Sequence, residues 1–183
     1  MKKTCYIWVF AACLFFLLAP KSLASENTEG RDRYKKAIRF IKEKQYDFAL
    51  LEFRAIIRDF PESRYTESSL FATGEYFYTR RAYYEASRNF TAYIERYPGS
   101  DGAIFARSYL LKIMQGIERP REEEVEALEN MEMAFFSQPL VLLFSEYKEV
   151  SYKSAFQNNF TIRYYMDTIE VYRNDTLFLK LAQ

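Results

Sequence analysis

Apolar residues recur at helical spacing through the first two-thirds of the chain. Ala49, Phe53 and Ile57 lie four residues apart, and this spacing places them on one face of an α-helix. The helix is expected to end before Pro61, because proline cannot extend a helix. A partner helix with its own apolar face is predicted upstream, over about residues 33–44.

The same pattern returns 37 residues later. Residues 46–63 read YDFALLEFRAIIRDFPES, and residues 83–100 read YYEASRNFTAYIERYPGS. Small residues such as Ala49 are expected where two helices cross closely, since a larger side chain would separate them. Gly74 falls inside a predicted partner helix, where glycine costs about 1 kcal/mol relative to alanine. A backbone crossing too close for a Cβ atom would explain its presence. A fixed period of this length indicates a helical-hairpin solenoid.

A third hairpin is less regular. Apolar spacing predicts a helix over about residues 102–115, and Pro120 stands where it can open a second helix. The repeats are therefore expected to occupy residues 31–136, as about 31–63, 67–100 and a degenerate 103–136. A terminal repeat is commonly atypical because it caps the stack.

Residues 137–183 are predicted to form a small extension with a different pattern. Within residues 152–183, segments rich in Ile, Val, Thr and Tyr are separated by turn residues, which favours an antiparallel β-meander. Alternation predicts that the three leucines of segment 176–181 share one face of a last strand with an apolar edge. The alternative is two further helices, since several apolar residues of this region also fit helical spacing.

Residues 1–24 have the pattern of a secretory signal. Lys2 and Lys3 precede a run of about 14 apolar residues, and Ser22-Leu23-Ala24 offers small residues for cleavage. The expected location is across the inner membrane, in the periplasm or facing it. Two alternatives remain open, namely an uncleaved N-terminal anchor and a lipoprotein modified at Cys13.

Composition narrows the chemistry. The chain of 183 residues has 26 Lys and Arg against 25 Asp and Glu, a balance that gives no support to nucleic-acid binding by a basic patch. It has no His, and its only cysteines are Cys5 and Cys13 in the signal segment. Cysteine nucleophiles, zinc sites and Ser-His-Asp triads are therefore excluded from the segment after residue 24. No cofactor, metal or catalytic residue is predicted.

The repeat resembles the tetratricopeptide repeat, and its ending resembles the longer-period repeats of bacterial envelope proteins. Among these are outer-membrane assembly lipoproteins and division-coordinating periplasmic proteins. The family's small residues, aromatics and terminal proline match these positions: Ala37 and Gly74, Phe40 and Phe77, Ala49 and Ala86, Phe53 and Phe90, Pro61 and Pro98. The family's early Trp is absent.

The resemblance implies a scaffold that holds a protein or peptide partner on the concave face of its first helices. Mapping by the repeats places seven residues near that face: Tyr34, Ile38, Lys42, Glu75, Tyr78, Ser108 and Lys112. The resemblance implies an adaptor in outer-membrane protein assembly or envelope biogenesis, with peripheral association with the outer membrane. Alternatives are a structural subunit of a secretion or pilus assembly, and a cell-wall-active enzyme with paired carboxylates on a helical scaffold.

Overall fold

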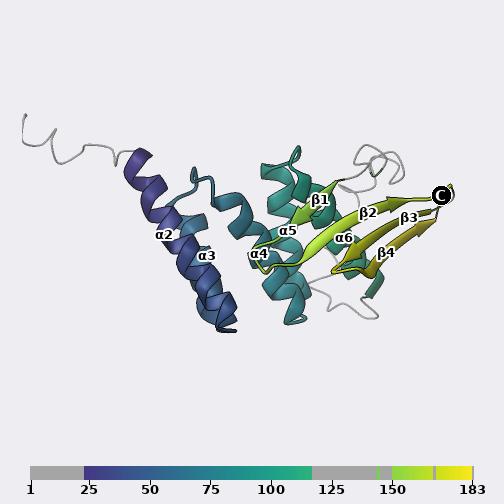
Figure 1. Cartoon of the computed structure of the whole chain (residues 1–183), viewed down its shortest axis with the longest axis horizontal. Coiled ribbons are helices and arrows are strands. Elements are labelled where there is room, and N and C mark those ends of the chain that lie inside the picture. The colour runs from purple at the N-terminus through teal and green to yellow at the C-terminus, as the bar shows by residue number, and fades with distance from the viewer. Residues whose placement is uncertain (1–22, 117–143, 145–149, 167, 183) are drawn as a thin grey trace, which may run out of the picture.

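A computed structural model describes residues 23–116, 144, 150–166 and 168–182, in which five helices precede a four-stranded sheet (Figure 1). The predicted fold class, a mainly helical hairpin array with a small C-terminal antiparallel sheet, is confirmed. The helices are α2 (Leu23–Lys42), α3 (Tyr46–Asp59), α4 (Thr66–Thr79), α5 (Tyr83–Arg96) and α6 (Asp101–Gly116). The strands are β1 (Ser151–Lys153), β2 (Asn159–Tyr164), β3 (Thr168–Arg173) and β4 (Thr176–Ala182).

The first two hairpins, α2–α3 and α4–α5, share one backbone turn. Lys44 and Arg81 are 37 residues apart, and both have a left-handed φ, of 60° and 59°. The amide of the next residue donates to a carbonyl five residues before it, over 2.8 Å in the first hairpin and 3.0 Å in the second. This bond satisfies a carbonyl at the end of the first helix. The sequence repeat is therefore also a repeat of backbone geometry.

Small residues lie where the helices of each hairpin meet. Ala49 and Ala86 are fully buried. A Cβ atom added to Gly74 would lie 2.7 Å from the ring of Phe90, which is closer than side-chain carbons approach one another. The expected lack of room for a Cβ atom is confirmed, but the expected backbone crossing is wrong as its cause, because the nearest atoms belong to the side-chain ring of Phe90.

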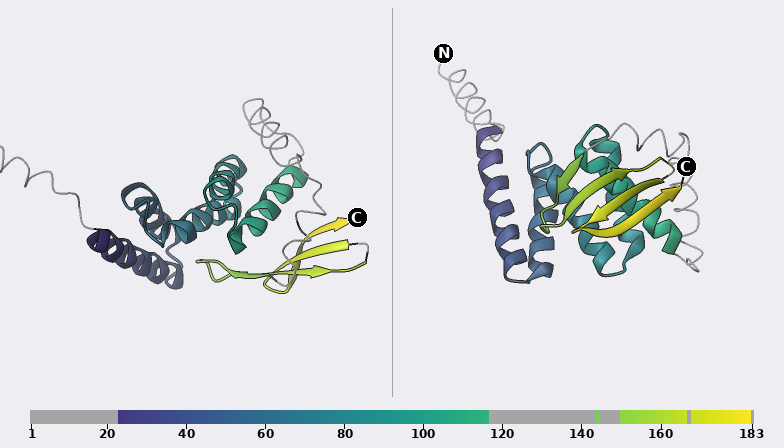
Figure 2. Two further views of the ribbon diagram at one scale, coloured as in Figure 1. Left: turned by 90° about the horizontal axis from the view of Figure 1, so that it is seen from above. Right: turned by 45° about the vertical axis from the view of Figure 1, so that its right-hand side comes forward.

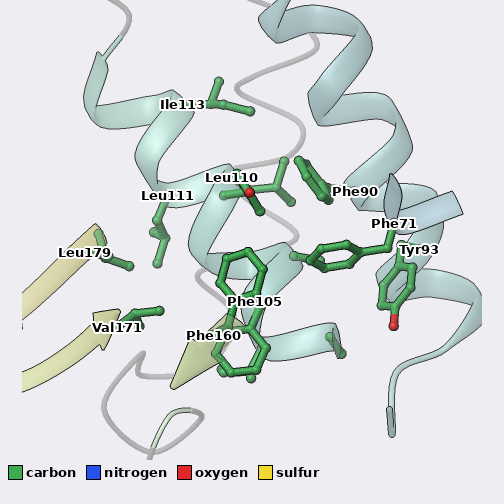
Figure 3. Close-up of a cluster of buried hydrophobic side chains, with 14 of the residues drawn as sticks. Phe71, Phe90, Tyr93, Phe105, Leu110, Leu111, Ile113, Phe160, Val171 and Leu179 are labelled. Atoms are coloured by element: carbon green, nitrogen blue, oxygen red, sulfur yellow. The ribbon is translucent and has the colours of Figure 1, made fainter. Parts of the chain in front are cut away.

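The sheet has the order β1-β2-β3-β4, and all of its pairs are antiparallel. It lies as a layer along one side of the helices (Figure 2). Its inner face adds Phe160, Val171 and Leu179 to the cluster formed by Phe71 and Phe105 of the helices (Figure 3). The predicted meander is thus confirmed, and the helical alternative for this segment is wrong.

A β-bulge corrects one prediction about the last strand. Val171 pairs with Leu179 and Tyr172 pairs with Leu177, so Phe178 has no residue opposite it. The extra residue shifts the alternation of side chains between the two faces. Leu177 is consequently 49% exposed while Leu179 is buried, so the three leucines do not share a face. Phe178 packs instead on the helices, with its ring centroid 4.9 Å from that of Tyr109.

Several predictions fall outside the described residues. They concern the signal segment up to residue 22, the second helix of the third hairpin, and most of residues 137–149. Within the part that the structure describes, no helix combines the length and apolarity needed to cross a bilayer.

Candidate functional site

The face formed by α2, α4 and α6 corresponds to the first helices of the predicted repeats, and it is the surface on which the sequence predicts a partner. We call it the first-helix face. The C-terminal sheet covers its α4 and α6 part. The ring of Phe71 on α4 lies 4.8 Å from Tyr152 of β1 and 6.0 Å from Phe160 of β2, centroid to centroid. Tyr109 on α6 lies 5.8 Å from Phe160. The chain itself therefore occupies this face.

The loop between β1 and β2 extends the cover to the first hairpin. Ala155 is only 4% exposed and packs in a second apolar cluster with α2 and α3 residues such as Ala37. The ring of Phe156 lies 6.3 Å from Phe53 and 5.9 Å from Tyr46. Sheet and loop together thus contact the α2–α3 hairpin, α4 and α6.

Three of the seven predicted site residues lie on α4 and α6 and are buried or half-buried. Glu75 and Ser108 are 1% and 0% exposed. The hydroxyl of Ser108 donates to the carbonyl of Ile104 in its own helix. Tyr78 is half-buried and packs edge-on against Tyr109 and Phe178, from α6 and β4. Because Glu75 and Tyr78 contact residues of the sheet and its loop, a partner could reach the whole of these two side chains only if the sheet moved.

The other four predicted residues are half-buried or exposed, three of them on α2 and one on α6. Tyr34 is half-buried and stacks on Tyr65 with 5.0 Å between centroids. Ile38 is half-buried against the second apolar cluster. Lys42 and Lys112 are exposed, on α2 and α6. The structure therefore brings Glu75 and Tyr78 under the sheet and leaves the two lysines apart, and partner binding by this set stays a prediction.

Glu75 is the centre of a polar cluster in the seam between sheet and helices. Its Oε1 accepts a hydrogen bond from the hydroxyl of Tyr109 at 3.0 Å and another from Nδ2 of Asn158 at 2.9 Å. Burial raises the pKa of Glu75, and hydrogen bonds from Ser154, Asn158 and Tyr109, with the positive charge of Arg173, offset part of that rise. The cluster joins α4, α6, the β1–β2 loop and β3, so it fixes how the sheet docks.

Sequence reasoning missed two members of this cluster. Asn158 has the pattern of a turn residue, and no local signal links it to a glutamate 83 residues away. Arg173 could have been found, because it alternates in phase with Ile169 and Val171, which face the helices. Its guanidinium lies 5.8 Å from the ring centroid of Tyr109.

A groove remains on the opposite helices, between α3 and α5, with two residues of α4 contributing to it. We call it the outer groove. Its volume is about 980 Å³. Its lining comprises Leu51, Arg54, Ala55, Ile57 and Arg58 of α3, Thr73 and Phe77 of α4, and Glu85, Arg88, Asn89 and Ala92 of α5.

The outer groove combines exposed apolar and basic side chains. Leu51 is 60% exposed, and Phe48, one turn earlier on α3, is 56% exposed. Arg54 and Arg88 are exposed on opposite walls, and neither forms an ion pair with a described residue. Arg58 is already held by Asp59, at 2.6 and 2.8 Å.

Sequence reasoning missed the outer groove as well. One feature of the sequence could have indicated it. Leu51 and Arg54 fall outside the apolar stripe Ala49–Phe53–Ile57, so the helical pattern leaves a leucine exposed beside an arginine, as at an interaction surface. Elsewhere among the described residues, no group of three or more Asp, Glu, Cys or His is placed to hold a metal ion.

The fold and these surfaces define a helical-hairpin array whose first-helix face is closed by its own sheet. No family model, curated protein or solved structure matches the chain.

Proposed function

We propose that the chain is a non-catalytic adaptor of the bacterial cell envelope, and that it binds a protein partner through the outer groove. One observation carries the proposal. The array leaves an apolar and basic groove open between α3 and α5, while its own sheet fills the face that repeats of this kind would otherwise offer. Exposed apolar patches rimmed by polar side chains are typical of interaction surfaces.

Support for the envelope location comes from the sequence alone. The signal pattern of residues 1–24 and the resemblance to tetratricopeptide repeats of envelope proteins agree with each other. The tetratricopeptide assignment is supported by the 37-residue repeat of turn geometry and by the buried small residues at the helix crossings. A periplasm-facing protein with peripheral outer-membrane association is the corresponding proposal for where the partner is met.

Site-specific photo-crosslinking in cells tests this function. A photoreactive amino acid is placed at Leu51 in the outer groove and, as a matched control, at Lys112, which is exposed on α6. We expect one stoichiometric adduct from position 51 and none from position 112, identified by mass spectrometry. An adduct from position 112 alone would move the partner to the first-helix face, and the absence of any adduct would contradict an adaptor.

A structural subunit of a larger assembly is the second candidate, favoured by the free edge of the sheet. Among the described residues, β4 pairs only with β3, so the other edge of this seven-residue strand can add a strand from a partner. A permanent complex that survives high salt and is crosslinked from position 177 on β4 would favour this candidate over the adaptor.

A further inference from the structure

We infer that the occupant of the outer groove is an acidic amphipathic helix of the partner protein. The inference rests on the proposed function and adds the chemistry of the partner. It starts from the two walls of the groove. Arg54 lies on α3 and Arg88 on α5, both exposed and both without an ion pair to any described residue. The guanidinium carbon of Arg88 lies over the ring of Tyr84, 5.9 Å from its centroid.

Apolar side chains lie between these arginines. Ala55 and Ile57 of α3, Phe77 of α4 and Ala92 of α5 line the groove, and the exposed Leu51 stands at its wall. A ligand that fits must therefore present an apolar stripe to the apolar lining of the groove and carboxylates to the arginines on its two walls. A helix with apolar residues at positions i, i+3, i+4 and i+7 and acidic residues beside them has this distribution.

The arginines of the groove indicate that the partner's charged groups are carboxylates. Its planar guanidinium can donate two parallel hydrogen bonds to one carboxylate, and it loses less hydration than an ammonium group does on binding. Arg54 and Arg58 are one helical turn apart on α3, so they can meet acids spaced one turn apart on a partner helix. Because Arg58 is already paired with Asp59, Arg54 and Arg88 carry most of the expected attraction.

Nucleic acids and anionic lipids are also negatively charged, but the groove suits them less well. Glu85 on the α5 wall would repel a continuous row of phosphates, whereas a helical peptide can place a lysine or a polar residue beside it. Leu51 offers aliphatic surface to apolar side chains of a peptide at the wall of the groove.

The test is fluorescence anisotropy with the purified full chain and a labelled helical peptide of about 18 residues, long enough to form a helix when bound. The peptide has leucine on one face and glutamate on the other, and its counterpart has lysine in place of every glutamate. We expect the acidic peptide to bind and the basic one not to bind. The double variant Arg54→Glu/Arg88→Glu should weaken binding about tenfold, because reversed charges repel the acids. Leu51→Ser should weaken it as well.

The matched control is Lys35→Glu/Lys153→Glu, which makes the same change of charge at two exposed positions outside the groove. It should change the affinity by less than about twofold. Equal weakening by the control, equal binding of the basic peptide, or no binding of the acidic peptide would overturn the inference. So would tighter binding of a single-stranded oligonucleotide or of anionic lipid vesicles.

Failure here is distinguishable from failure of the adaptor function. If crosslinking at position 51 captures a stoichiometric partner and Arg54→Glu/Arg88→Glu leaves that adduct unchanged, the adaptor stands and the acidic helix is wrong. If no adduct forms, the adaptor itself fails, whatever the peptides do.

Discussion

The two sides of the hairpin array differ in what they bury. On the first-helix face, aromatic rings from α4 and α6 interlock with rings from β1, β2 and β4, and the buried carboxylate of Glu75 is hydrogen-bonded across the seam. In the outer groove, arginines and a leucine stand exposed. The comparison shows that a helical repeat can use one side for its own stability and still leave the other side exposed.

A single helix contributes to both sides. Phe71, Glu75 and Tyr78 of α4 are spaced by four and three residues and face the sheet, whereas Thr73 and Phe77 are spaced by four and face the groove. Two faces of one helix thus separate the stabilising contacts from the open surface. Substitutions on the two faces should therefore have different consequences.

The largest expected effect is that of Phe71→Ala. Phe71 is fully buried and its ring lies against those of Phe90, Tyr93, Tyr109, Tyr152 and Phe160. Removing it should lower the free energy of unfolding by about 3–5 kcal/mol, because a cavity is left in the core. Leu51→Ala on the open side should change it by no more than about 0.5 kcal/mol. Urea denaturation measures both, and similar losses would remove the contrast between the two sides.

Gly74→Ala should have the next largest effect. Its added Cβ would lie 2.7 Å from the buried ring of Phe90, so the hairpin must open slightly. We expect a loss of about 1–3 kcal/mol from overpacking, although alanine is the better helix former by about 1 kcal/mol. Gly116→Ala, where the new Cβ meets no atom within 4 Å, is the control and should not destabilise. Thermal melts of the two variants compare them, and an unchanged melt for Gly74→Ala would contradict the close crossing.

A smaller effect on stability is expected from the polar cluster around Glu75, between the sheet and the helices. Burial raises the pKa of Glu75 above its ordinary value of 4.5, so the folded state binds a proton that the unfolded state has released. The stability contributed by protonated Glu75 is fully present below pH 4.5 and is lost as the pH rises through the raised pKa. The charged and titratable groups around it are Arg173, Tyr109 and Tyr152.

Glu75→Gln should remove this pH dependence. The amide keeps an oxygen that can accept the bonds from Tyr109 and Asn158 but cannot ionise. Denaturation of both proteins from pH 4 to 8 measures their free energies of unfolding. The free energy of the unsubstituted protein, minus that of the variant, should fall as the pH rises. Glu43→Gln, at an exposed position on the turn after α2, is the matched control. If the difference in stability between the two proteins is constant with pH, or if the unsubstituted protein gains stability relative to the variant as the pH rises, Glu75 is ionised in the seam.

The smallest effect on stability is expected in the outer groove. Arg54→Glu/Arg88→Glu should shift the free energy of unfolding by no more than about 0.5 kcal/mol, since neither arginine pairs with a described residue. Its consequence should appear in binding alone. A large destabilisation in the same urea experiment would mean that these arginines serve the fold.

Much of the fold could be predicted because its signals are local. The stripe of Ala49 and Phe53, its return 37 residues later, and the turn at Asn174-Asp175 each depend on neighbours along the chain. The docking of the sheet depends on contacts between distant residues, such as Glu75 with Asn158, which no local pattern reveals. The bulge at Phe178 was also out of reach, because alternation assumes an unbroken ladder. For the same reason, Glu75 and Tyr78 were assigned to an open face that the sheet covers.

Thiol labelling of two single-cysteine variants tests most directly whether one side is closed and the other open. In a chain whose Cys5 and Cys13 are replaced by alanine, cysteine is introduced at Ser154, which is 2% exposed in the loop docked on the helices, or at Leu51 in the outer groove. Iodoacetamide should modify Leu51→Cys rapidly in the native protein. Ser154→Cys should react more slowly by orders of magnitude and become reactive only when the protein unfolds in denaturant. Equal native rates at the two positions would show that the sheet does not close the first-helix face.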